Sequence, residues 1–257
     1  LLSKEQIIPK GVHLFHYILA PILIVAISLL ILAIIPFADT LAIGDKKIPM
    51  QILTIDAGLL WYLALTSLMV YAVVLAGWAS NSKYSLLGGA RSSAQMISYE
   101  LPRGLSLIGV LMIFGTLQLN DIVTQQGELL WGVIPKWGIM VQPLGAIIFI
   151  ICAFAETNRT PFDLAEGESE IVAGYHTEYS GMLFGMFFMA EYVALVVASA
   201  MIVTLFFGGW QVPYMTTAQL MEWASVLAPI ALGLSALVSL ALAFLCYRYY
   251  KTNANRF

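Results

Sequence analysis

The sequence predicts an all-α protein that crosses a membrane several times. Its 257 residues are 60% hydrophobic and only 11% charged, and the mean hydropathy is +0.87. Soluble domains carry about 25% charged residues, so a chain this apolar fits a bilayer better than water. The apolar residues also gather in runs near 20 residues, which is roughly the length that an α-helix needs to span the hydrocarbon core.

Six of these runs qualify as spanning helices. In chain order they are Leu14–Pro36, Thr54–Gly77, Leu101–Leu119, Met140–Ala155, Leu183–Phe207 and Ala224–Tyr247. The fourth run is somewhat short. Six such helices in a soluble core would need a polar coat that this chain lacks, so we expect one transmembrane domain over residues 1–257. Because the sequence begins with Leu1 and not with Met, we expect further sequence upstream.

Two connections are longer than simple turns. Residues 78–100 contain a polar start around Asn81 and Lys83, a glycine pair and the polar stretch Ser92–Gln95. This pattern predicts a loop followed by a short helix that lies at the membrane surface. The second connection, about residues 156–181, is predicted to be a large acidic loop.

The lysines and arginines of the short loops predict the orientation. Before the fifth span, the side that carries Leu1 holds six of them: Lys4, Lys10, Lys83, Arg91, Arg103 and Arg159. The opposite side holds three: Lys46, Lys47 and Lys136. We therefore expect the side of Leu1, with the acidic loop, to face the cytoplasm or the mitochondrial matrix.

The acidic loop concentrates carboxylates. It holds six of the chain's fifteen acids, with Arg159 as the single arginine or lysine among them, and these acids are Glu156, Asp163, Glu166, Glu168, Glu170 and Glu178. A solvated acidic loop is the ordinary alternative, but interleaved apolar residues such as Phe162 and Tyr175 are not needed for solvation. Crowded carboxylates raise one another's pKa, so this cluster can exchange protons near neutral pH.

Three carboxylates lie in or beside the predicted spans. Glu191 is inside the fifth span, where a charged residue costs roughly 2.5–3.5 kcal/mol on insertion scales, so we expect it to face protein or water. Glu100 and Glu156 are predicted at the cytoplasmic ends of their helices, where they can reach water. A function and a structural hydrogen bond are both open for these residues.

Other signals point to no chemistry of the chain's own. His13, His16 and His176 lack the spacing and cysteine partners of a metal site. Cys152 and Cys246 lie in apolar runs, which is typical of buried cysteines. The net charge of −3 does not favour nucleic-acid binding.

Several long motifs stand in a fixed order along the chain. They comprise Gly77–Tyr84, Arg91, Ser98–Glu100, Glu156–Asp163, Glu166, Glu168, Glu170, Ala173–Gly181, Ala190–Tyr192 and Gly208–Trp210. In order and spacing, over about Lys4 to Trp210, these motifs resemble the quinone-site membrane subunit (NuoH type) of respiratory complex I, the NADH:quinone oxidoreductase.

The resemblance also has departures. The family has eight spanning helices, and its first helix is not found ahead of Leu1. After Trp210 the family continues with another span, whereas here Gln219–Pro229 resembles the approach to the family's last helix. If that span is missing, the tail with Arg248 belongs on the side opposite to Leu1.

The resemblance implies a subunit that forms the floor of a quinone-binding chamber and couples quinone reduction to proton translocation. The chamber and coupling loop would involve Arg159, Asp163, Glu166, Glu168, Glu170, Tyr175 and Glu178. Glu100, Glu156 and Glu191 would begin a path of buried carboxylates. Quinone (ubiquinone or menaquinone) would be the substrate, entering from the lipid. The chain itself would hold no catalytic residue, cofactor or metal.

The implied partners are the hydrophilic-arm subunits around the terminal iron–sulfur cluster, small membrane subunits and antiporter-like subunits. FMN and the iron–sulfur clusters would belong to those partners. The location would be the inner membrane of a bacterium or, alternatively, of a mitochondrion.

Three other functions are open from the sequence. The first is the related membrane subunit of a hydrogenase or formate hydrogenlyase, although the intact motifs around Glu156 and Tyr175 favour the quinone enzyme. The second is a stand-alone ion transporter, which predicts inverted repeats that the sequence does not show. The third, a passive anchor for a soluble enzyme, leaves Glu191 unexplained.

Overall fold

The computed structural model of the chain describes residues 5, 7–43, 46–159, 162–163 and 173–214, and also residues 223, 229–230, 232–233, 235–237, 239–240 and 242–243. These residues belong to two compact units, Leu1–Gln211 and Val212–Phe257. The described residues are mostly helical, which confirms the predicted all-α membrane protein.

Four helices of the first unit are long and apolar enough to cross a bilayer. They are α1 (Leu14–Leu32), α2 (Gly58–Ala79), α3 (Lys83–Phe114) and α8 (Gly181–Phe206). A further apolar helix, α6 (Pro143–Glu156), has 14 residues and rises only about 21 Å, less than the roughly 30 Å of the hydrocarbon core. These five correspond to the first five predicted spans.

The sixth predicted span, Ala224–Tyr247, belongs to the second unit. Most of it lies outside the described residues, and those described between 229 and 243 are helical.

Short elements connect the helices at the end of the first unit that we call the hairpin end. Strands β1 (Thr40–Ile43) and β2 (Lys46–Pro49) pair antiparallel, as do β3 (Leu129–Leu130) and β4 (Ile134–Pro135). Helices α4 (Leu119–Gln126) and α5 (Gly138–Val141) lie there too. The opposite end, the loop end, holds the turn at residues 80–82 and the 3₁₀ turn η1 (Gly174–His176).

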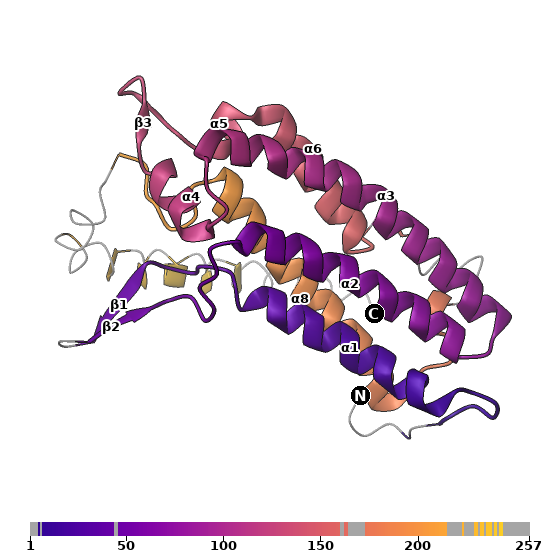
Figure 1. The fold of residues 1–257 in the computed structure, drawn as a ribbon. Helices are drawn as coiled ribbons and strands as arrows, with labels where there is room; N and C mark the ends of the chain where they lie inside the picture. Colours follow the sequence, from indigo (N-terminus) through magenta and orange to yellow (C-terminus); the bar gives the residue numbers. More distant parts are fainter. Residues whose placement is uncertain are drawn as a thin grey trace, which may run out of the picture. The chain divides into compact units, whose positions relative to one another are not determined.

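The five apolar helices form a closed ring. Helix α1 packs against α2 and α8, α3 packs against α2 and α6, and α6 contacts α8. Figure 1 shows them running side by side between the two ends. Lipid tails are as apolar as leucine, so close packing and polar contacts, rather than hydrophobic burial, hold such helices together.

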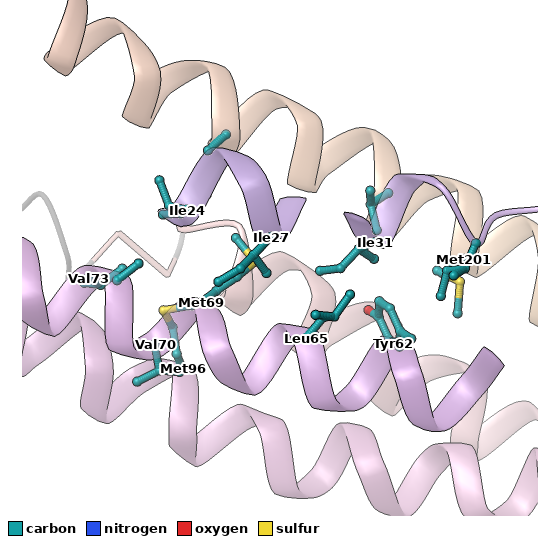
Figure 2. Close-up of a cluster of buried hydrophobic side chains, with 14 of the residues drawn as sticks. Ile24, Ile27, Ile31, Tyr62, Leu65, Met69, Val70, Val73, Met96 and Met201 are labelled. Carbon is teal, nitrogen blue, oxygen red and sulfur yellow. The ribbon is translucent and has the colours of Figure 1, made fainter. Parts of the chain in front are cut away.

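The packed layer between α1 and α2 is rich in branched aliphatic and methionine side chains. Figure 2 shows Ile24, Ile27 and Ile31 of α1 facing α2, where Leu65 and Met69 meet them. Most exposed residues of α3 are apolar as well, among them Leu101, Leu105 and Met112, as expected for a lipid-facing surface.

Residues 83–114 form one helix of 32 residues, so the predicted separate surface helix before Glu100 is wrong. Two polar side chains in the first half of this helix bind protein. The hydroxyl of Ser85 donates to the carbonyl of Tyr175 at 2.7 Å. The amide of Gln95 donates to the carbonyls of Ala155 at 2.7 Å and Phe162 at 2.9 Å.

Gly88 allows η1 to cross α3 at close range. A Cβ built on Gly88 would lie 2.6 Å from the carbonyl carbon of Gly174 and 2.7 Å from the amide nitrogen of Tyr175. Real Cβ atoms do not approach backbone so closely, so any larger residue has to displace η1.

We expect Gly88→Ala to loosen the loop end and to lower stability by about 1–3 kcal/mol, the usual cost of overpacking. The measurement is thermal unfolding together with protease sensitivity of residues 173–180. Gly104→Ala is the matched control on the same helix, since its Cβ would meet nothing within 4 Å. Alanine there should be neutral or stabilising by up to about 1 kcal/mol. Equal stability of the two variants would contradict the role given to Gly88.

Candidate functional site

A buried ion pair lies inside the ring of helices. The guanidinium of Arg103 on α3 is in direct contact with the carboxylate of Glu156 at the end of α6, and the two side chains are 2% and 15% exposed. Arg103 also donates to the hydroxyl oxygen of Thr66 at 2.6 Å, and its guanidinium carbon lies 5.2 Å from the ring centre of Tyr62. Helices α2, α3 and α6 therefore meet at one charged group.

Arg103 was predicted as a cytoplasmic loop residue, and this prediction is wrong. Arg103 lies inside α3 (Lys83–Phe114), a helix long and apolar enough to cross a bilayer, and its side chain is 2% exposed. The excess of basic residues on the side of Leu1 is therefore smaller than the sequence count suggested.

Glu100 lies in the middle of α3 and not at a helix end as predicted. Its carboxylate is hydrogen-bonded to the hydroxyl of Ser67 on α2. Ser67 follows Thr66 directly, so neighbouring residues of α2 contact Glu100 and Arg103. Glu100 and Arg103 are three residues apart, which places them on one face of α3.

Glu191 is paired with Arg159. Their side chains form an ion pair at 3.2 Å, with the carboxylate 19% exposed, and the guanidinium lies 5.2 Å from the ring centre of Tyr192. Glu191 is ten residues into α8, or about 15 Å from its start. Glu191 was expected to face protein or water, and this contact shows that it faces protein. Asp163, which is exposed, is close enough for its charge to act on Glu191.

The described part of the acidic loop contacts the helices through the Tyr175 side chain and through backbone carbonyls. Tyr175 is buried, with its ring 5.5 Å from that of Phe187. The carbonyl of Glu178 accepts a hydrogen bond from the hydroxyl of Tyr17 at 2.7 Å. Three predicted residues of the coupling loop, Glu166, Glu168 and Glu170, lie outside the described residues.

His176 lies in an aromatic cluster at the loop end. Its ring is 4.9 Å from Tyr175, 5.3 Å from Phe184 and 5.9 Å from Phe188, between ring centres. It is buried, and this burial lowers the pKa of His176 to about 4. The imidazole is therefore neutral at physiological pH.

Two cavities border the carboxylates. A small cavity of about 20 Å³ lies inside the ring and has Ser28, Tyr62, Thr66, Glu156 and Thr157 among its lining residues. It is large enough for one water molecule. A wider groove of about 500 Å³ runs along α2 and α3, where Glu100 is the one acid among Leu63, Ile97, Leu101, Gly104, Leu105 and Ile108.

The model of one protein family, described as NADH dehydrogenase, matches residues 1–254. The chain belongs to this family. It is 51% identical over 247 residues to "NADH-quinone oxidoreductase subunit 8" of Rhodothermus marinus, a match that covers 96% of this chain and 69% of the relative. The resemblance seen in the sequence motifs is thereby confirmed.

Two other bacterial relatives are also named as subunits of NADH-quinone oxidoreductase. That of Salinibacter ruber is 51% identical over 82% of this chain and 58% of its own length. That of Solibacter usitatus is 47% identical over 93% of this chain and 59% of its own length. The chain thus spans about three fifths to two thirds of the length of these relatives.

Residues that sequence reasoning missed hold the family's motifs in place. Gln95, Ser85 and Tyr17 bind backbone carbonyls of the loop end, and Arg103 binds Glu156. Among the described residues, no three His, Cys, Asp or Glu side chains gather as metal ligands.

The low pKa of His176 makes the loop end sensitive to acid. The folded-state pKa of about 4 lies below the unfolded value near 6.5. The contribution of neutral His176 to the free energy of unfolding is therefore fully present above pH 6.5. This contribution is lost as the pH decreases from about 6.5 to 4, and the loss amounts to up to about 3 kcal/mol. We expect His176→Phe to remove this part of the pH dependence, as measured by thermal unfolding across that range. The same substitution at the exposed His13 is the control and should keep it.

Proposed function

We propose that the chain is the membrane subunit of a proton-translocating NADH:quinone oxidoreductase, the enzyme for which its relatives are named. In this proposal it forms the floor of the quinone chamber and couples quinone reduction to proton movement. The observation that carries the proposal is the pairing of three carboxylates with polar partners inside or beside apolar helices. Charged residues inside membrane-spanning helices cost free energy and are usually functional.

The proposed coupling is electrostatic. Reduction of a quinone to a quinol takes up two electrons and two protons, and we infer that those protons are drawn from the region of the acidic loop. Removing them changes the charge near Asp163 and the Arg159–Glu191 pair. The change then acts on Glu156 and its partner Arg103, and from there on Glu100. One pKa unit is about 1.4 kcal/mol, so several coupled carboxylates can transmit several kcal/mol.

The groove beside Glu100 supports an exit from the path toward membrane partners. Its walls are apolar, and two of its leucines are largely exposed, Leu101 by 71% and Leu105 by 69%. Such a wall fits lipid or an apolar helix, but the carboxylate of Glu100 can accept hydrogen bonds beyond the one from Ser67 and fits a polar neighbour. We therefore infer that a partner subunit with a polar or ionisable side chain covers this groove.

The remaining assignments follow from this proposal. Quinone, either ubiquinone or menaquinone, is the substrate. FMN and the iron–sulfur clusters belong to hydrophilic partners. The bacterial relatives support a location in the inner membrane, with the acidic loop on the cytoplasmic side.

The subunit composition of the native complex tests the assignment. We expect gentle detergent extraction and mass spectrometry to find this chain with iron–sulfur subunits, a flavin-bearing NADH module and antiporter-like subunits. A nickel–iron hydrogenase subunit in its place would contradict the quinone assignment in favour of the hydrogenase branch. A chain that migrates alone would contradict both and favour a transporter.

The coupling role is tested by neutral variants of two carboxylates. We expect Glu156→Gln and Glu191→Gln to abolish quinone reduction, because neither can carry a changing charge, while the peripheral reduction of artificial acceptors by NADH continues. The matched control is Glu128→Gln at the hairpin end, where an exposed carboxylate pairs with Lys136 at 3.0 Å and contributes little. Full quinone activity in both test variants would contradict the coupling path.

A further inference from the structure

Arg103 is the largest of the fully buried side chains among the described residues. It lies inside α3, a helix long and apolar enough to cross a bilayer, and arginine inside such a helix is costly without a partner. Its stem and guanidinium take up space that an apolar side chain would fill without this cost. Packing alone therefore does not explain an arginine at this position.

The contacts of Arg103 fix its guanidinium in one place. Glu156 holds it from α6, while the oxygen of Thr66 and the ring of Tyr62 hold it from α2. Thr66 also has the carbonyl of Leu63 at 2.9 Å as an acceptor, so its lone pairs remain free to receive the arginine proton. A planar, permanently charged guanidinium suits such a site better than a mobile ammonium.

A purely stabilising role is a weak explanation for this pair. Removing two charges from water costs more than their attraction returns in many buried pairs, and apolar residues of equal volume often stabilise as well or better. Helices α3 and α6 already pack closely. The ion pair adds a fixed positive charge to this packed interface.

The location of this charge suggests its use. Arg103 contacts Glu156 directly and lies three residues from Glu100 on the same face of α3. The small cavity beside the pair can hold a water molecule next to Glu156. A charge change at Glu156 is thus felt at Glu100 through Arg103, over neighbouring residues and not through lipid.

We propose that Arg103 is a positioning residue for coupling, which holds the Glu156 carboxylate inside the ring and supplies the fixed countercharge for its protonation. This inference rests on the proposed function and names a residue of the same path. With Glu156 ionised, the pair is neutral. When Glu156 takes up a proton, the pair gains one positive charge, because Arg103 keeps its own proton. That charge then faces Glu100 and stabilises it as an anion.

The groups that face Glu156 and Arg103 come from every helix of the ring. Tyr62 and Thr66 lie on α2, and Cys152 on α6 is within electrostatic reach of Arg103. Glu100 lies three residues before Arg103 on α3. Helix α1 contributes Ser28 and Ile31 to the cavity, and α8 contributes the apolar residues Ala194, Val197 and Ala198.

The test uses the whole complex with Arg103→Gln and Arg103→Lys, and with Met112→Leu as control at an exposed position of α3. Four quantities are measured: the amount of assembled complex, NADH oxidation with an artificial acceptor, quinone reduction with its pH profile, and protons moved per quinone. We expect Arg103→Gln to lower quinone reduction by about tenfold or more and to leave acceptor reduction intact. Arg103→Lys should recover most of the rate, with a displaced pH profile, because its charge sits differently.

Each outcome decides the inference. A parental quinone rate in assembled Arg103→Gln overturns it. If that variant does not assemble, Arg103→Lys decides alone: a displaced pH profile supports the inference, and a profile identical to the parent overturns it. Full activity of Glu156→Gln itself would instead contradict the proposed function.

Discussion

The charge of Arg103 has to be neutralised inside a ring of apolar helices, and the arrangement of α2, α3 and α6 satisfies this constraint. Helix α6 ends at Glu156, so its carboxylate and its last carbonyls lie together. A carboxylate there is unfavourable for the helix dipole, and a cation is favourable. Arg103 supplies that cation from α3.

Polar contacts also close the ring at its two ends, where lipid provides no hydrophobic force. At the loop end, Gln95 binds the last turn of α6 and the chain that follows it. At the hairpin end, the buried Gln126 accepts from the amides of Gly138 at 3.1 Å and Gly208 at 3.0 Å. Each amide joins segments that are distant in sequence. The ends therefore hold the register of the helices, and the ion pair holds the centre.

Hydropathy predicted the first five helices because each one exposes apolar residues to lipid. That requirement applies to each lipid-facing residue, so it is visible in the local sequence. The sequence motifs identified the family for a similar reason. The joined helix of residues 83–114 was not predictable from the same signal. Its first half is polar because Ser85 and Gln95 bind a loop about 70–90 residues further along the chain. Nothing local distinguishes such a buried polar face from a face that lies on the membrane surface.

Arg103 was missed for a different reason. Counting basic residues by loop assumes that each one lies outside the hydrocarbon, whereas the expense of intramembrane charge applies equally to both signs. That rule singled out Glu191 from its position inside an apolar run. Arg103 stands in the apolar run that begins at Leu101, so the same rule applies to it. An arginine within a predicted span should be treated as the partner of a carboxylate, and the acids nearest a neighbouring helix end, such as Glu156, are the first candidates.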